Sequence, residues 1–256
     1  MKTDLTHSNF FSYVEKHTED DITKLRHEIK FEYINTDISK IDTILGINCQ
    51  RVIHASEESM VNSIYFDDFS LTSLRQNLDG IGMRIKLRLR WYDAELPGKN
   101  AFFEIKRRSN YIVKKERYAI ASCQPLNRMT YPEIIKELLR VLPETPRELL
   151  RMRQQPVVLI RYKRKHFKAR DARLPIRITL DQHIEGYEQI GMKLPVAKFK
   201  VPLHDRIVLE AKSVIGNEKN IPKLLYPLRP RQSRFSKYVL TCSQLGLITG
   251  LNEYFV

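Results

Sequence analysis

The chain of 256 residues carries 44 lysine and arginine residues against 30 acidic residues, so its formal net charge is +14. This length can bury a sizeable core, and a hydrophobic fraction of 42% indicates a folded globular protein rather than a disordered one. The excess of positive charge favours anionic partners such as nucleic acid, an acidic membrane or a polyphosphate, although a generally basic soluble surface explains the net charge equally well.

The cysteines and the first residues of the chain bear on where the protein works. Cys49, Cys123 and Cys242 are far apart in the sequence and contain no C-x-x-C pair, which argues against a disulfide framework and a zinc site. Residues 1–21 lack the apolar centre of a signal peptide, and no run approaches the ~20 apolar residues that span a bilayer. We therefore expect a cytoplasmic protein with reduced thiols.

The first half of the chain is predicted to begin with a helix and to continue mainly as strands. The helix is expected at residues 8–16, within an N-terminal helical segment of residues 1–23. From residue 24 the hydrophobic period changes to two, which predicts a strand as far as residue 33. The elements expected next are a helix at residues 39–45, a strand at 61–66, a turn or short helix at 70–78, and strands at 83–92, 102–107 and 114–120.

The second half combines a helical insertion with further strands. Two amphipathic helices are expected at residues 131–141 and 145–153, which places the insertion at about residues 131–154. The remaining expected elements are strands at residues 157–166, 176–181 and 207–213, and a helix at 230–245 that ends at Gly246. This succession predicts an α+β fold over residues 24–256, in which a closed antiparallel β-barrel has flanking helices and a C-terminal helix.

The predicted strand at residues 83–92 divides its side chains between two faces, because residues two apart on a strand share a face and lie about 7 Å from each other. One face carries the cationic row Arg84, Lys86, Arg88 and Arg90, and the other carries the apolar row Ile85, Leu87, Leu89 and Trp91. For an isolated strand the simpler interpretation is an apolar face on a core and a basic face in solvent, since charged residues are seldom buried unpaired.

A repeated pattern favours a different interpretation of the basic row. A glutamate and a lysine two residues apart occur on three predicted strands, as Glu28 and Lys30, Glu104 and Lys106, and Glu210 and Lys212. Strands with this pattern fit a barrel that is covered by helices outside and is a wet, charged tunnel inside. Cations in such a tunnel repel one another unless a polyanion neutralises them, and the glutamates can hold a divalent metal that bridges phosphate oxygens.

Nine short strings occur in one order along residues 24–245. They are RHEIKF at 26–31, SIYFD at 63–67, LRLRWY at 87–92, FEIKR at 103–107, KERY at 115–118, YKR at 162–164 followed by Phe167, IRITLD at 176–181, VLEAK at 208–212 and RFSKY at 234–238. Each string alone is a weak signal. The ordered set resembles the catalytic domain of the vacuolar transporter chaperone (VTC) polyphosphate polymerases, a branch of the triphosphate tunnel metalloenzymes.

The resemblance implies roles for individual residues. Those expected to hold phosphate during catalysis are Lys30, Arg88, Arg90, Lys106, Lys115, Arg164, Arg177 and Lys237. Those expected to bind substrate are Tyr162, Lys212, Arg234 and Ser236. Glu210 is expected to hold Mn²⁺ or Mg²⁺, whereas Glu28 and Glu104 are either further metal ligands or, preferably, partners of neighbouring lysines. Arg84 and Lys86 are expected at the tunnel mouth, where they would guide a chain.

The resemblance implies a polyphosphate polymerase that transfers the γ-phosphate of ATP to the end of a growing inorganic polyphosphate chain. A metal-dependent tripolyphosphatase or nucleoside triphosphatase of the same fold is the first alternative. Arg26 replaces the first glutamate of the E-x-E-x-K pattern of triphosphatases, which favours chain binding over two-metal hydrolysis.

The second alternative is a non-enzymatic binder of polyphosphate, inositol phosphate or nucleic acid. Nucleic acid is not expected, because the basic residues alternate with aliphatic side chains rather than with the aromatic ones that stack on bases. A membrane-protein partner and the oligomeric state stay open.

Overall fold

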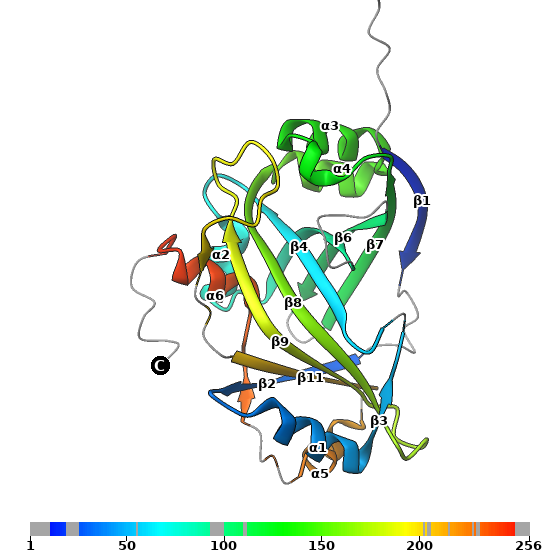
Figure 1. Ribbon diagram of the computed structural model, residues 1–256. Coiled ribbons are helices and arrows are strands. Elements are labelled where there is room, and N and C mark those ends of the chain that lie inside the picture. Colours follow the sequence, from blue (N-terminus) through cyan, green and yellow to red (C-terminus); the bar gives the residue numbers. More distant parts are fainter. Residues whose placement is uncertain are drawn as a thin grey trace, which may run out of the picture.

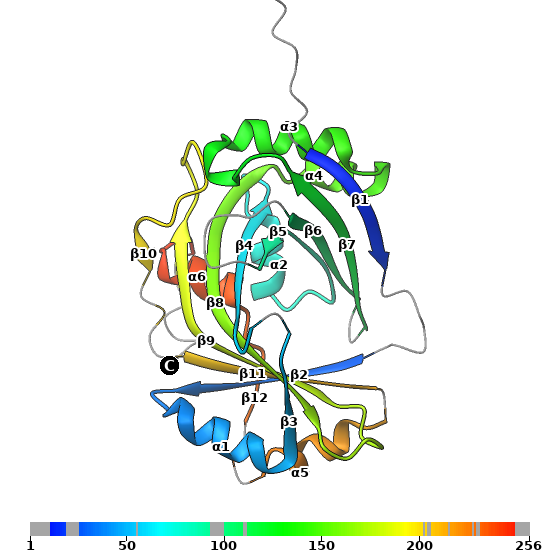
Figure 2. The ribbon, with the colours of Figure 1, turned by 45° about the vertical axis from the view of Figure 1, so that its right-hand side comes forward.

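The computed structural model describes residues 11–18, 26–54, 56–92, 100–109, 112–201, 203, 206–214, 216–226, 228 and 231–248. One twelve-stranded antiparallel sheet, strongly curved, forms the body of the protein, and helices pack against both its outer and its concave side (Figures 1 and 2). The strands are β1 Phe11–Thr18, β2 Arg26–Ile34, β3 Cys49–Val52, β4 Ser59–Asp67, β5 Met83–Trp91, β6 Asn100–Ser109, β7 Ile112–Ser122, β8 Gln155–Ala169, β9 Arg177–Glu188, β10 Lys200–Val201, β11 Arg206–Val214 and β12 Gln232–Ser233. The helices are α1 Ile38–Asn48, α2 Thr72–Leu78, α3 Tyr131–Val141, α4 Glu144–Arg151, α5 Ile221–Leu224 and α6 Lys237–Gln244, with 3₁₀ turns at Leu126–Arg128 and Glu218–Asn220.

The strand order confirms the α+β class and corrects the expected closed barrel. The sheet runs β1-β7-β6-β5-β4-β8-β9-β11-β2-β12, with β10 beside β9 and β3 beside β8. Among the described strands, no backbone hydrogen bonds join the two ends of this path. Strands β2 and β11 cross the open side of the arch instead (Figure 2), and side chains span the gap, as where Lys106 on β6 donates to Glu28 on β2. Long charged side chains keep these strands farther apart than the ~4.8 Å spacing of a hydrogen-bonded pair.

The two ends of the chain differ from the sequence-based expectation. Phe11–Thr18 form strand β1 beside β7, where a helix was expected, and Phe11 is buried in an apolar cluster. Pairing with the open edge of β7 supplies backbone hydrogen bonds and burial that outweigh a short helical pattern. The C-terminal helix begins only at Lys237, because Ser236 caps it and Gln232–Ser233 pair with β2. The described residues leave out residues 8–10 and 230 of the expected helices, the rest of the expected N-terminal segment at 1–7 and 19–23, and residues 24–25 of the expected strand.

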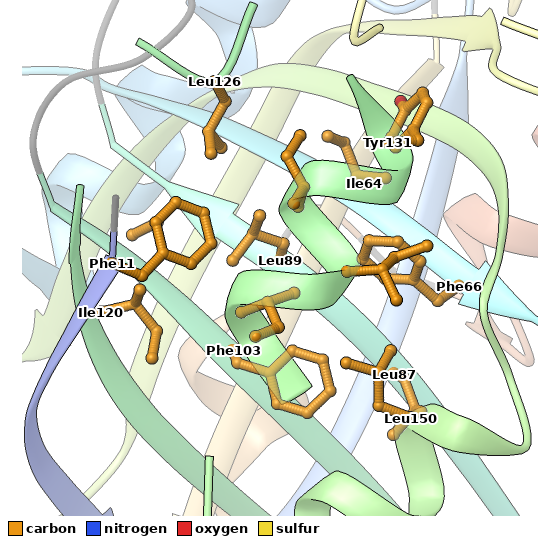
Figure 3. Close-up of a cluster of buried hydrophobic side chains, with 14 of the residues drawn as sticks. Phe11, Ile64, Phe66, Leu87, Leu89, Phe103, Ile120, Leu126, Tyr131 and Leu150 are labelled. Atoms are coloured by element: carbon orange, nitrogen blue, oxygen red, sulfur yellow. The ribbon is translucent and has the colours of Figure 1, made fainter. Parts of the chain in front are cut away.

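The apolar row of β5 faces outward and packs under the helical insertion, as the inverted arrangement predicts. Leu87, Leu89 and Trp91 are fully buried. They belong to a cluster to which α3 and α4 contribute Ile134, Leu138 and Leu150 (Figure 3). Since alternate residues of a strand lie on opposite faces, this burial turns the cationic row of β5 toward the concave side of the sheet.

Two further apolar clusters fix the other helices. Helices α1 and α5 cover the outer face of β2, β9 and β11 through side chains such as Ile41 and Leu224 against Leu209. Helix α6 packs with Tyr238 and Leu240 against β4 and β8, next to α2 (Figure 1). The first residues of α6 are thereby held against the concave side of the sheet.

Gly186 on β9 allows α6 to approach the sheet closely. A β-carbon at this position would lie within 3.0 Å of Thr241 Oγ1 on α6 and would clash with the methyl group of Thr241. The hydroxyl of Thr241 also donates to the backbone oxygen of Lys237 at 2.9 Å, so its side chain is not free to turn away.

We predict that Gly186→Ala lowers the free energy of unfolding by about 1–3 kcal/mol, because the added methyl overpacks the contact with α6. Adding Thr241→Ser, which keeps the hydroxyl and removes the clashing methyl, should recover part of the loss. Urea unfolding of the single and double variants measures both effects. Equal midpoints for wild type and Gly186→Ala would show that α6 does not sit this closely on β9.

Candidate functional site

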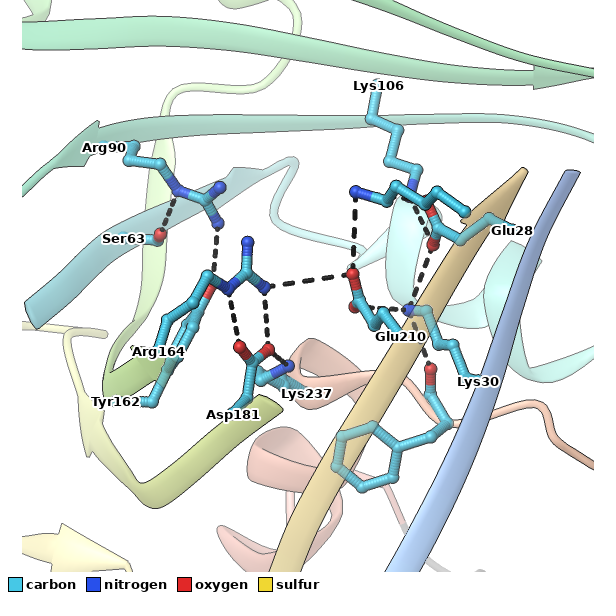
Figure 4. A network of polar contacts seen from close by, with 12 residues as sticks. Glu28, Lys30, Ser63, Arg90, Lys106, Tyr162, Arg164, Asp181, Glu210 and Lys237 are labelled. Atoms are coloured by element: carbon cyan, nitrogen blue, oxygen red, sulfur yellow. Dashed lines mark hydrogen bonds and ion pairs between the residues drawn. The ribbon is translucent and has the colours of Figure 1, made fainter. Parts of the chain in front are cut away.

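Neutral and acidic partners hold the cationic row of β5 in place on the concave side, and Figure 4 shows the partners of Arg90. Arg90 is only 4% exposed; it donates to Ser63 Oγ at 3.0 Å and to the Tyr162 hydroxyl at 3.3 Å. Arg88 donates to the Tyr65 hydroxyl at 3.0 Å. These contacts come from β4 and β8, so three neighbouring strands fix the two guanidinium groups.

Glu104 on β6 is a shared counter-ion for four cations. Its carboxylate lies 2.7 Å from Arg88, 2.8 Å from Lys115, 3.4 Å from Arg117 and 3.6 Å from Arg90. Burial would raise the pKa of Glu104, but the cations hold it well below its usual range. The carboxylate is therefore ionised and already paired with these cations, which favours the interpretation of Glu104 as a partner of neighbouring cations.

A second charged cluster lies on β2 and β11, facing β6. Lys30 Nζ is 3.4 Å from Glu210 and 3.6 Å from Glu28, and Lys106 Nζ is 3.2 Å from Glu28. Lys212 lies 3.8 Å from Glu210 and 3.9 Å from Glu28. Burial opposes ionisation of Glu28, yet Lys106, Lys30 and Lys212 lower its pKa to about 2 despite the neighbouring charge of Glu210. The two glutamates thus face the same space.

Asp181 on β9 joins two of the predicted phosphate-binding cations. Arg164 forms a fork on its carboxylate at 2.6 and 2.7 Å, and Lys237 donates to it at 2.6 Å. Both cations also lie over the Tyr162 ring, whose centroid is 5.2 Å from Arg164 Cζ and 4.7 Å from Lys237 Nζ. This role is not among the sequence-based predictions, although Asp181 ends the matched string IRITLD and shares a face with Arg177.

Most predicted site residues share the concave side, and two lie at its margin. Arg177 is exposed and pairs through its backbone with Lys212 at the end of β9. Arg234 is exposed just before α6. Ser236 accepts a hydrogen bond of 3.0 Å from Lys86, which places Ser236 beside the cationic row of β5. The catalytic and binding roles of these residues remain predictions.

The sequence profile of the family described as VTC domain matches residues 14–245. The chain belongs to the VTC domain family. No curated protein sequence matches it significantly. No helix in the described part of this VTC domain combines the length and apolar character needed to cross a membrane.

Several solved structures have a backbone similar to that of this protein. A protein of Pyrococcus horikoshii has 13% identity, a TM-score of 0.44 and coverage of 86% of this chain and 99% of its own. A candidate adenylate cyclase of Bacillus halodurans has 10% identity, a TM-score of 0.48 and coverage of 91% and 98%. A candidate adenylyl cyclase of Hippeastrum, described as having a dominant triphosphatase activity, has 13% identity, a TM-score of 0.45 and coverage of 88% and 99%.

The carboxylates of the VTC domain fit a divalent metal that is held partly by the protein and partly by the phosphate oxygens of the substrate. Within the described ranges, no group of three or more histidine, cysteine, aspartate or glutamate side chains gathers as a metal site. Glu210 and Glu28 nevertheless face one space, and the cations around Glu210 lie at 3.4–3.8 Å, farther than the 2.6 Å contacts of Asp181. One or two carboxylates plus phosphate oxygens are the usual ligands of Mg²⁺ in phosphate-handling sites.

We predict that Asp181→Asn lowers the free energy of unfolding of the VTC domain by about 3–5 kcal/mol, because Arg164 and Lys237 are left buried without their nearest counter-ion. Burial opposes ionisation, but these two cations depress the pKa of Asp181. Its contribution is therefore present above the unfolded pKa of about 4 and is lost as pH falls toward the depressed folded pKa.

Chemical unfolding near neutral pH and near about pH 3 tests this expectation, since the difference from wild type should shrink in acid. Asp171→Asn, which removes an exposed carboxylate paired with Arg173, is the matched control and should leave the midpoint almost unchanged. An Asp181→Asn variant as stable as this control would contradict the shared-counter-ion role.

Proposed function

We propose that this VTC domain is a polyphosphate polymerase that transfers the γ-phosphate of ATP to the end of an inorganic polyphosphate chain. The observation that carries the proposal is the concave side of the sheet, where cations from β2, β5, β6, β7, β8, β11 and α6 surround only a few shared carboxylates. Membership of the VTC domain family supports it. A phosphate chain would supply the negative charge that this side of the sheet lacks.

In the proposed reaction a terminal oxygen of the chain forms a bond to the γ-phosphorus of ATP. The bond from that phosphorus to the oxygen bridging the β- and γ-phosphates breaks, and ADP leaves with that electron pair. The forked guanidinium groups of Arg88, Arg90 and Arg164 suit phosphate oxygens. Their fixed partners pre-orient them, so catalysis consists of positioning and charge neutralisation.

Glu210, with Glu28 beside it, would hold the divalent metal. With Mn²⁺ or Mg²⁺ held by these two glutamates, part of the charge of the transferring phosphate would be neutralised. The chain's own contribution at this point is Lys30, whose ammonium group lies between the two glutamates. Burial would lower the pKa of Lys30, but Glu210 and Glu28 raise it, so Lys30 stays charged.

Incubation with ATP and Mn²⁺, followed by gel electrophoresis of the product and measurement of free phosphate, tests the proposal. We expect phosphate chains longer than triphosphate, formed together with ADP. If phosphate is released and no chain grows under any metal or primer condition, the metal-dependent triphosphatase is the correct function. If ATP is bound but not consumed, the protein is a polyanion binder.

We predict that Glu210→Gln abolishes metal-dependent turnover while the affinity for inorganic triphosphate without metal is kept or increased, because a repelling charge is removed. Arg88→Ala should weaken triphosphate binding by about tenfold to a hundredfold, as expected when hydrogen bonds to a charged group are removed. Arg88→Lys, which keeps the charge and loses the fork, should fall between Arg88→Ala and wild type.

Calorimetric titration with triphosphate and the ATP assay measure the two effects separately. Arg173→Ala, which removes an exposed arginine, is the control for net charge. Unchanged activity of either Glu210→Gln or Arg88→Ala in a folded protein would contradict the assigned site.

The affinity for triphosphate should depend on pH through Lys115. Burial lowers the pKa of Lys115 to about 8; Glu104 opposes the shift, and Arg88 and Arg90 add to it. A bound anion favours the charged ammonium, so binding takes up a proton once the pH exceeds the free pKa. We predict that affinity falls by as much as ~tenfold per pH unit above that pKa.

Titrations between about pH 7 and about pH 9 follow the charge of Lys115 through its transition. Lys115→Arg keeps its charge over this range and should flatten the profile, with a remaining slope from Lys86, whose pKa is also lowered. An equally steep profile for wild type and Lys115→Arg would show that Lys115 does not contact the phosphates.

A further inference from the structure

Like charges stand side by side on one part of the concave face. The strand register places Lys86 on β5 opposite Lys106 on β6, and Lys106 opposite Lys115 on β7. One step further along the same face, Arg84 is opposite Arg108. Directly opposed like charges destabilise a pair of strands. Two successive cationic rungs therefore need a reason other than stability.

The compensation of charge differs along this face. The rung of Arg88 contains Glu104, which balances its neighbours. In the next rung, Lys106 reaches Glu28 at 3.2 Å and Lys115 reaches Glu104 at 2.8 Å. Lys86 donates instead to a neutral hydroxyl, that of Ser236. Burial and then the neighbouring cations Lys30, Lys106, Arg84 and Arg88 hold the pKa of Lys86 well below its usual range.

A third arginine joins the outer rung from the segment before α6. The strand register places Arg108 opposite Arg84, and burial, then the charges of Arg108 and Arg234, lower the pKa of Arg84. Arg84 is half-buried, while Arg108 and Arg234 are exposed. Ser236, two residues after Arg234, contacts Lys86. The cationic residues thus extend from the half-buried Lys86 and Arg84 to the exposed Arg108 and Arg234.

We propose that Arg84, Lys86, Arg108 and Arg234 form a second anion subsite, which holds the distal phosphates of a chain longer than triphosphate. The row from Arg90 to Arg84 spans roughly 20 Å, from six residues at about 3.3 Å each, which exceeds the length of a triphosphate. This inference rests on the proposed function and adds a direction: the chain leaves the site past the end of β5 that Arg84 marks.

The test compares inorganic triphosphate with a long-chain inorganic polyphosphate on the whole protein, by titration at several salt concentrations. The variant is Arg84→Ala combined with Arg108→Ala. It should lose much more affinity for the long chain than for triphosphate. Its plot of log affinity against log salt for the long chain should become shallower by about 0.7 for each phosphate that the variant no longer neutralises, the value known for flexible single-stranded nucleic acids.

Arg151→Ala combined with Arg173→Ala is the matched control, because it removes two exposed arginines from elsewhere on the surface. It should bind both ligands as wild type does. The second subsite does not exist if Arg84→Ala combined with Arg108→Ala weakens the binding of both ligands in the same proportion. It also does not exist if the control loses as much affinity for the long chain. In either case the proposed function still stands. If wild type binds neither ligand, the proposed function fails together with this inference.

Discussion

Mutual repulsion among cations on one face of a curved sheet is the constraint on which the rest of the structure depends. The apolar row of β5 must lie under α3 and α4, and the strand geometry then forces Arg84, Lys86, Arg88 and Arg90 to the concave side. Glu104 and Asp181 each serve several cations at once. Buried charges are tolerated only with such partners, and because the carboxylates are shared, the balance stays positive. A bound polyanion would complete it.

The alternation of residues could predict the faces of the strands but not how the ends of the sheet meet. Along β5 the period of two is enough to predict which side chains face the core, because alternate residues of a strand lie on opposite faces. Strand β1 was predicted as a helix, since its structure depends on the open edge of β7, which is distant in the sequence. The prediction that the sheet closes into a barrel was also wrong. Strand β2 could meet β6 through backbone hydrogen bonds or only through the side chains of Glu28 and Lys106. Which of the two occurs depends on the length of the side chains that lie between the strands.

The positions of the candidate site residues were predictable where they follow from the strand face, and less so where they depend on α6. Lys30 and Arg88 lie on the strand face that the alternation predicts, and their roles remain predictions. The strand pattern did not predict the contact of Lys86 with Ser236, because this contact depends on the packing of α6 on β9. Asp181 carried no signal of its own, since one carboxylate at a strand position does not reveal which cations it will face.

The most direct test of the central claim is a crystal structure of the protein with triphosphate and Mn²⁺. The phosphates should lie on the concave side between Arg88, Lys106 and Lys30, with the metal on Glu210. That arrangement would show that the unbalanced charge of this face is its binding site. Phosphates bound only on the outer, helix-covered side, with the concave cations keeping their present partners, would contradict the account.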